Sequence, residues 1–467
     1  MSFTAQLSTP QVWVIQSADT FLEGILIKKP LFPALILGSL LIAACGSISE
    51  AIQVPQSPML ASLERKSGLI AYLGPDGNIY TIDQAGGKLN MVTDDAHGAE
   101  GGVRRFYDFP AWSLEDNKLA FVGVDVQENG SAIASIFATD EKAEGAREIY
   151  TSDSHVPFFL YWSPNGEWVS FLSSTQGSTS MAMQIAPVEG GESSVVDTGR
   201  PYYWAWSPEG TKVMAHAGGS AAANPDGARL SLVEMKPVIH ETGLGIQPTN
   251  FQAPVYSPDG EYAMLAGASG GQQQLILTDS SGRLLRVLAD FEGNIAFDWA
   301  PKGNFAAYLT SDANSQARVG DLTFLDLRKP DEPKLIPTEA NDVMGFFWAP
   351  DGKKLAFFVP VVLSEAAEGE EQTAENTRFL LELHILETKN GDFKRIAAFQ
   401  PTPTFLNIFP FFDQYQRSVT IWSPNSRYIV VSAIATEDVQ GLFIVPASGD
   451  FEPRFLTQGR LGFWSWD

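Results

Sequence analysis

The sequence is poor in residues that form disulfides or bind metals. It contains one cysteine, Cys45, so no disulfide bond can form within the chain and packing alone must stabilise the fold. Only five histidines are present. No two of them stand three or four positions apart, the spacing that a metal site on a helix requires. The sequence therefore predicts no metal ion and no cofactor.

Positive charge is also scarce, and this argues against one class of partner. The 31 Lys and Arg residues face 55 Asp and Glu residues, which gives a formal net charge of −24. An acidic surface repels phosphate backbones, so we expect no nucleic-acid partner. The acidity does not indicate calcium, because no D-x-[DN]-x-[DN]-G loop is present.

Sequence motifs for catalysis are missing in the context that they need. Helical periodicity is nearly absent, so no Gly-rich loop opens a helix around a phosphate. One G-x-S-x-G run occurs at residues 267–271. A nucleophile elbow needs a strand before it and a helix after it, whereas this Ser269 lies in a short polar loop between two apolar runs. We therefore predict no catalytic residue and interpret the chain as a protein that is not an enzyme.

The N-terminal region has the pattern of an export signal. Lys28 and Lys29 precede an uncharged apolar run from Pro30 to Ala44. At about 1.5 Å per residue this run is shorter than the ~30 Å hydrocarbon core, so a permanent transmembrane helix is the weaker interpretation. Residues 1–27 are atypical for a signal peptide, and a translation start near Leu26 would leave a signal of ordinary length.

The signal ends in Leu41-Ile42-Ala43-Ala44-Cys45-Gly46. This run resembles the lipobox of bacterial lipoproteins, in which two small residues precede the cysteine that receives the lipid. The resemblance implies a signal peptide at residues 1–44 and lipid attachment at Cys45. Residues 45–62 are small, polar and proline-containing, which predicts a flexible tether. The protein is then expected outside the cytoplasm, anchored to the cell membrane, or to an outer membrane where the host has one.

One short motif recurs roughly every 40–50 residues along the rest of the chain. Complete copies are Trp162-Ser163-Pro164-Asn165-Gly166, Trp206-Ser207-Pro208-Glu209-Gly210, Tyr256-Ser257-Pro258-Asp259-Gly260, Trp299-Ala300-Pro301-Lys302-Gly303, Trp348-Ala349-Pro350-Asp351-Gly352 and Trp422-Ser423-Pro424-Asn425-Ser426, with a degraded copy at Trp112-Ser113-Leu114-Glu115-Asp116. Ser, Pro and Gly fit positions i, i+1 and i+3 of a tight turn. Each copy thus predicts a strand that ends in an aromatic residue and reverses into an apolar strand.

The repeat unit predicts an all-β fold consisting of a single β-propeller of four-stranded antiparallel blades over residues 63–467. Eight blades are expected, with seven as the alternative if one degraded unit merges with its neighbour. The last copy, Trp464-Ser465-Trp466-Asp467, stops at its turn, whereas residues 68–93 supply three strands without a first one. We therefore expect the C-terminal strand to complete the N-terminal blade and close the ring.

The motif resembles the Trp-Ser-Pro-Asp-Gly repeat of TolB-like propellers, which also occurs in the propellers of prolyl-oligopeptidase-type enzymes. The resemblance implies protein–protein contact with components of the cell envelope. The peptidases carry a separate α/β-hydrolase domain, for which no residues remain in this chain.

Two insertions interrupt the period, at residues 360–378 and 400–417. The first is acidic, and the second is rich in aromatic residues. In a propeller, the loops that join strands two to three and four to one emerge on the same face, where a rigid scaffold usually presents its functional residues. The candidate binding face consists of Arg104, Arg105, Tyr107, His155, Tyr202, Tyr203, Phe411, Phe412 and Tyr415. One alternative is that the aromatic residues of the second insertion fold back on the propeller and form a small core of their own, a private core. Another is that the bulkier residues of the candidate face are simply the first residues of inner strands.

The sequence as a whole predicts a lipid-anchored, monomeric propeller that binds a protein or a cell-envelope polymer. A rival interpretation is a carbohydrate-active enzyme, a lyase or glycosidase, with its site in the central channel. A third is a lipoprotein that captures a solute or polymer for a transporter.

Overall fold

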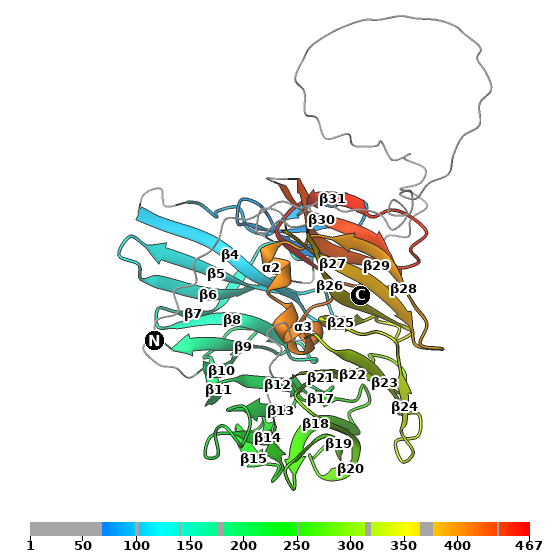
Figure 1. Ribbon diagram of the computed structural model, residues 1–467. Coiled ribbons are helices and arrows are strands. Elements are labelled where there is room, and N and C mark those ends of the chain that lie inside the picture. The colour runs from blue at the N-terminus through cyan, green and yellow to red at the C-terminus, as the bar shows by residue number, and fades with distance from the viewer. Residues whose placement is uncertain are drawn as a thin grey trace, which may run out of the picture.

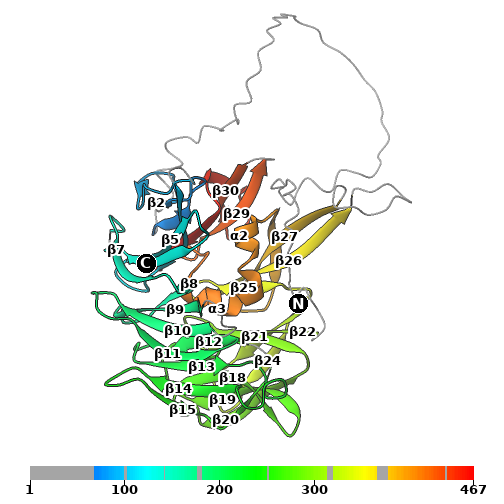
Figure 2. The same cartoon turned by 90° about the vertical axis from the view of Figure 1, so that its left-hand side faces the viewer.

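The computed structural model describes residues 68–98, 102–140, 142–175, 181–249, 252–312, 319–364, 377–436 and 439–467. In these residues the strands form eight antiparallel sheets, which are the blades of one β-propeller (Figures 1 and 2). The all-β class and the count of eight blades are confirmed. Residues 1–67, with the predicted signal peptide, Cys45 and the predicted tether, lie outside the described residues.

The blades are numbered along the chain, and their strands are given from the innermost to the outermost. Blade 1 consists of β32 (Leu461–Trp464), β1 (Ile70–Leu73), β2 (Ile79–Ile82) and β3 (Asn90–Met91). Blade 2 consists of β4 (Val103–Trp112), β5 (Leu119–Gln127), β6 (Ala132–Ala138) and β7 (Arg147–Ser152). Blade 3 consists of β8 (His155–Trp162), β9 (Trp168–Thr175), β10 (Met181–Pro187) and β11 (Ser194–Gly199). Blade 4 consists of β12 (Tyr202–Trp206), β13 (Lys212–Ala217), β14 (Arg229–Glu234) and β15 (His240–Gly243).

The second half of the ring follows the same plan, with short or divided inner strands in blades 5 and 8. Blade 5 consists of β16 (Gln247–Pro248), β17 (Val255–Tyr256), β18 (Tyr262–Ser269), β19 (Gln272–Asp279) and β20 (Leu284–Phe291). Blade 6 consists of β21 (Asn294–Trp299), β22 (Phe305–Ser311), β23 (Asp321–Asp326) and β24 (Lys334–Pro337). Blade 7 consists of β25 (Gly345–Trp348), β26 (Lys354–Ser364), β27 (Thr377–Glu387) and β28 (Phe393–Phe399). Blade 8 contains β29 (Tyr428–Thr436), β30 (Val439–Pro446) and β31 (Arg454–Gln458).

The ring closes through the C-terminal strand, as the truncated last motif predicted. β32 pairs antiparallel with β1, with Ile70 opposite Trp464 and Leu73 opposite Leu461. The backbone N–H of Ser465 donates to the carbonyl of Leu69 at 2.7 Å. Blade 1 therefore combines strands from both ends of the chain, which removes two open sheet edges.

The repeated motif supplies the turn between the first two strands of a blade. In blade 3 the Ser163 hydroxyl donates to Asn165 Oδ1 at 2.7 Å and accepts from the backbone N–H of Trp168 at 3.0 Å. Ser423 makes the corresponding pair of hydrogen bonds in blade 8. Gly166 adopts a φ of 67°, a left-handed conformation that costs glycine little.

Several motif tryptophans also join adjacent blades. Their indole N–H groups donate to a backbone carbonyl on the inner strand of the preceding blade: Trp112 to Phe463 at 3.3 Å, Trp162 to Ala111 at 2.9 Å and Trp422 to Phe347 at 2.9 Å. In each case the acceptor directly precedes the aromatic residue of its own motif. The tryptophan therefore packs between two blades with its polar atom satisfied.

The acidic insertion begins and ends as strand. β26 and β27 continue their pairing as far as Ser364 and Thr377, so residues 360–364 and 377–378 lengthen a hairpin. The part that contains Glu365, Glu368, Glu370, Glu371 and Glu375 lies outside the described residues. Within the described part of the chain, no helix is long and apolar enough to span a membrane.

Candidate functional site

The aromatic insertion interrupts the inner strand of blade 8. Its first residues pair with the C-terminal half of β29, where the N–H of Thr402 donates to the Ser432 carbonyl at 2.9 Å. The chain then leaves the sheet and returns at residues 420–422, where the N–H of Val430 donates to the Ile421 carbonyl at 2.8 Å. Residues 403–418, which we call the channel insert, are therefore looped out of the middle of one strand.

The channel insert forms three short helical segments in the centre of the ring (Figures 1 and 2). They are α2 (Pro403–Leu406), η3 (Phe409–Phe411) and α3 (Phe412–Ser418). Thr402 starts α2 because its hydroxyl accepts the N–H of Phe405 at 3.1 Å and Pro403 holds a helical φ at the first position. α3 contacts β8, β12, β21 and β25, which are the inner strands of four blades.

The aromatic residues of the insert pack against the propeller, so they form a private core. Phe405, Phe409 and Phe412 are at most 4% exposed. The ring of Phe412 lies 4.9 Å from that of Phe346, and the ring of Phe409 lies 5.0 Å from that of Phe358. Phe411 is 39% exposed and is the residue of this group that reaches solvent.

Polar side chains of α3 bind backbone groups on the inner edges of the blades. Gln414 both accepts from the N–H of Trp204 at 3.3 Å and donates to its carbonyl at 2.9 Å. Asp413 accepts the N–H of Ala253 at 2.9 Å. Inner strands leave such groups unpaired toward the channel, so the helix supplies hydrogen bonds that a neighbouring strand would otherwise make.

A buried ion pair fixes the C-terminal end of α3. Arg417 donates to Asp298 at 3.3 Å, and both side chains are less than a tenth exposed. The guanidinium also donates to the carbonyl of Phe297 at 3.2 Å and to that of Pro254. Burial raises the pKa of Asp298 to about 6, although Arg417 and a backbone N–H act in the opposite direction.

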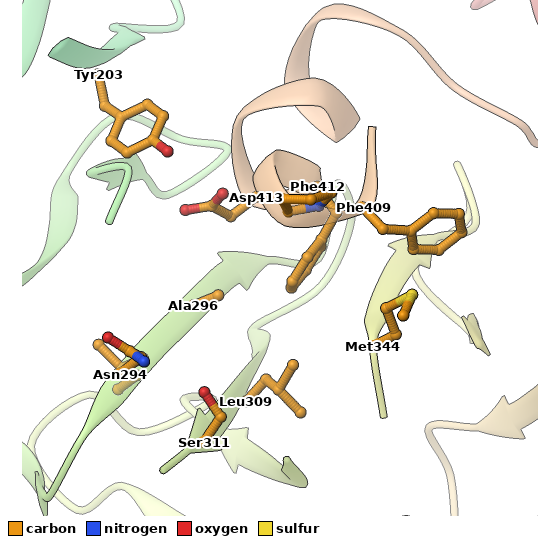
Figure 3. A pocket seen from close by; sticks show the side chains of 11 residues that line it. Tyr203, Asn294, Ala296, Leu309, Ser311, Met344, Phe409, Phe412 and Asp413 are labelled. Carbon is orange, nitrogen blue, oxygen red and sulfur yellow. The ribbon is translucent and has the colours of Figure 1, made fainter. Parts of the chain in front are cut away.

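The described residues form two cavities that adjoin the insert. The smaller, of about 40 Å³, lies between α3 and blades 4, 6 and 7; Figure 3 shows Phe412 and Asp413 projecting into this region, with Tyr203 and Ala296 around it. Its volume suits about one or two water molecules. The larger, of about 200 Å³, lies between the insert and the inner strands of blades 1, 2 and 3.

We call the larger cavity the β4–α3 pocket. Its walls are mostly apolar, and its polar groups come from both the blades and the insert. It is lined by Asp108, Phe109, Pro110, Ala111, Phe159, Leu160, Thr404, Asn407, Ile408, Tyr415, Ser418, Val419, Leu461 and Phe463. Asn407 is exposed, so the pocket reaches the surface beside α2.

Asp108 gives this pocket its electrostatic character. Its carboxylate accepts the N–H of the next residue, Phe109, at 2.8 Å, and it takes part in no ion pair among the described residues. Burial is the main cause that raises the pKa of Asp108, while the Phe109 N–H and the charge of Arg460 lower it. Burial, followed by the charge of Asp108, also raises the pKa of Tyr415.

The backbone is strained where two of the aromatic residues enter the pocket. Phe109 and Phe159 adopt φ values of 53° and 54°, a left-handed conformation that is costly for a bulky side chain. Both lie at bulges, between Asp108 and Ala111 in β4 and between Phe158 and Leu160 in β8. Strain of this kind concentrates at ligand-binding sites. Equivalent irregularities in neighbouring blades therefore mark the pocket as the best candidate site.

The residues that the sequence proposed for a binding face lie on blades 2, 3 and 4 and in the channel insert. Arg105 pairs with Asp95 at 2.5 Å and with Asp125 at 2.6 Å, and Tyr107 donates to Asp95 at 2.6 Å. The Arg104 guanidinium lies 5.1 Å from the centre of the Phe106 ring. These contacts stay within the first two blades.

The other proposed residues lie elsewhere. His155 begins β8, and its Nδ1 lies 3.1 Å from the Ser154 hydroxyl. Tyr202 and Tyr203 are buried at the start of β12, and Phe412 is buried at the start of α3. Of the proposed set, Tyr415 lines the β4–α3 pocket. Sequence reasoning missed Asp108, for which the available signal was an acidic residue among the apolar and aromatic residues 106–112 in the second half of β4.

Comparisons with known proteins show likeness at the level of the fold. No family model and no curated protein matches the chain. A TolB structure from Acinetobacter baumannii matches with 13% identity and a TM-score of 0.34, covering 72% of this chain and 78% of that one. An oligogalacturonate lyase in complex with manganese matches with 15% identity and a TM-score of 0.45, covering 82% and 97%. An oligogalacturonate lyase from Vibrio parahaemolyticus matches with 13% identity and a TM-score of 0.45, covering 81% and 98%.

These matches correct one interpretation made from the sequence. The chain was interpreted as a protein that is not an enzyme because no catalytic motif stood in a familiar context. The structures with a similar fold include oligogalacturonate lyases. Propeller architecture therefore gives no ground for excluding an enzyme. Among the described residues, no group of three or more His, Cys, Asp and Glu side chains is arranged to hold a metal ion.

Proposed function

We propose that this chain is an extracytoplasmic binding module, tethered to a membrane through a lipid on Cys45, which holds part of a protein or envelope polymer in the β4–α3 pocket. The observation that carries the proposal is the pocket itself. It combines an unpaired, partly buried carboxylate with two strained aromatic residues. Apolar walls with a few convergent polar groups are the usual composition of a binding site.

The closed ring is consistent with the same proposal. The described chain begins at Gly68, two residues before β1, in the blade that strands from both ends of the described chain build. The channel insert occupies the centre of the ring. Of the two cavities described beside it, the β4–α3 pocket is the larger. A partner is therefore expected to insert a small group rather than to thread the channel.

Replacing the lipobox cysteine should release the protein from the membrane. In the Cys45→Ala variant the thiol that receives the lipid is missing, so the chain is expected in the soluble fraction and without label from a fatty-acid analogue. Ser47→Ala, two residues away, is the control and should behave like the wild type. Membrane retention of Cys45→Ala equal to that of the control would contradict the anchor.

Filling the pocket should abolish partner binding while the fold persists. Thr404 lines the pocket from α2 and is partly exposed, so the indole of a Thr404→Trp variant can occupy the cavity. After cross-linking in cells and affinity purification, the variant is expected to lose the partner that the wild type retains, with an unchanged melting temperature. Phe411→Ser, an exposed change in the same insert, should retain it. Loss in Phe411→Ser alone would place the contact on the outer face of the insert instead.

A further inference from the structure

The β4–α3 pocket carries one formal charge, and that charge is negative. Of the described residues that line it, Asp108 is acidic and none is Lys, Arg or His. The remaining polar side chains are neutral: Thr404, Asn407, Tyr415 and Ser418. Arg460 is the cation whose charge reaches Asp108, but its guanidinium donates to the carbonyls of Gly74 and Pro75, each at 3.3 Å. The carboxylate is therefore left without a dedicated counter-ion.

Aromatic rings provide much of the rest of the wall. Phe109, Phe159, Tyr415 and Phe463 line the pocket, and the Phe159 and Tyr415 rings meet edge to face at 5.2 Å. Aromatic faces attract cations through their quadrupole, most strongly where water is excluded. A carboxylate surrounded by aromatic rings thus forms an environment that favours an organic cation over an anion.

We propose, on the basis of the binding function proposed above, that this pocket takes up a monovalent organic cation, an alkylammonium or guanidinium group, with Asp108 as its counter-ion. A free amine and a Lys or Arg side chain of a partner share this chemistry. A cavity of about 150 Å³ holds a benzene molecule, so the 200 Å³ here accommodates a short alkyl chain with its charged end.

Other ligand classes fit the pocket less well. An anion would meet the carboxylate of Asp108, and no Lys, Arg or His lines the pocket to bind the anion. A wholly apolar ligand would remove water from Asp108 and leave a buried charge unpaired, which is costly. A divalent metal ion needs several oxygen ligands, whereas the pocket offers one carboxylate.

The same interaction predicts a pH dependence. Burial raises the pKa of Asp108, and a bound cation favours the ionised form and lowers it again. The groups that influence this carboxylate are the Phe109 N–H, Arg460 and the Tyr415 phenol. An alkylammonium ion stays protonated up to pH of about 10. The affinity for the cation should therefore rise as pH rises through the pKa of Asp108 and then level off. At pH values below this plateau, binding of the cation should release a proton from Asp108.

The test is calorimetric titration of the full chain carrying Cys45→Ala, with n-butylammonium, a short lysine peptide whose N-terminal amine is blocked, and the same blocked peptide acetylated on its lysine. We expect the cationic probes to bind and the acetylated peptide not to bind. Asp108→Asn should weaken binding about tenfold or more, because a charge-assisted contact is lost. Asp116→Asn, which removes an exposed charge from the turn of the same blade, should leave affinity unchanged. Stronger binding of the peptide would identify a partner side chain, and stronger binding of the amine a free solute.

Three outcomes would overturn the inference: no binding of either cationic probe, equal binding of the acetylated peptide, or equal affinities of Asp108→Asn and Asp116→Asn. Asp108→Asn should fold normally, since Asn can still accept the Phe109 N–H, and its melting temperature verifies this. The proposed function is tested by a different outcome from the one that tests the cation. If Thr404→Trp loses a cellular partner but no cation binds, the pocket is a binding site for another chemistry.

Discussion

A chain that lacks residues 459–467 is expected to aggregate or to melt at a much lower temperature than the wild type. These residues contain β32, whose four residues pair with β1, and Trp464, which is fully buried. Loss of a packed tryptophan costs about 3–5 kcal/mol, against a typical domain stability of about 5–15 kcal/mol. The deletion also exposes the edge of β1 and removes the carbonyl of Phe463 that Trp112 binds.

The measurement is thermal unfolding together with size-exclusion chromatography. Removal of Asp467 alone is the matched control, because this residue is exposed and lies beyond β32. A melting temperature of the long deletion equal to that of the control would show that β32 contributes little to closure.

Replacing Arg417 with Met should be the most damaging single change in the channel insert. The guanidinium is the ion-pair partner of Asp298 and also binds carbonyls of blades 5 and 6. Removing one member of a buried ion pair leaves the other uncompensated, which typically costs about 3–5 kcal/mol. The double variant Arg417→Met/Asp298→Asn is expected to recover part of the loss, since it removes the orphaned charge as well.

The pH dependence of unfolding distinguishes this cause from a simple loss of packing. The pKa of Asp298 is raised to about 6 in the folded chain, above the ordinary value of about 3.9 for an unfolded aspartate. The folded state thus binds a proton more tightly, so the contribution of Asp298 to stability falls as pH rises from about 4 to about 6. The deficit of Arg417→Met should be smaller at pH 5 than at pH 8. A deficit that is equal at both values would contradict the role of the charge.

Part of this architecture could be predicted because its causes are local. Ser163, Pro164, Asn165 and Gly166 build their turn from hydrogen bonds that span at most five residues, so the sequence shows the turn directly. Repetition of that turn predicted eight blades. The incomplete first and last units predicted the pairing of β32 with β1, because a sheet edge that lacks a strand needs one.

The sequence by itself thus determined the propeller and its closure, and only the tertiary structure decided what occupies the centre of the ring. The aromatic insertion had two possible environments, a private core or a partner surface, and its composition is the same in both. The outcome depends on residues far apart in the chain: Phe412 packs on Phe346, and Gln414 binds Trp204. Asp108 acquires its unpaired, partly buried state in the same way, because α3 and β32 enclose it from distant parts of the sequence. Burial and pKa are properties of such three-dimensional surroundings, so no local pattern could reveal them.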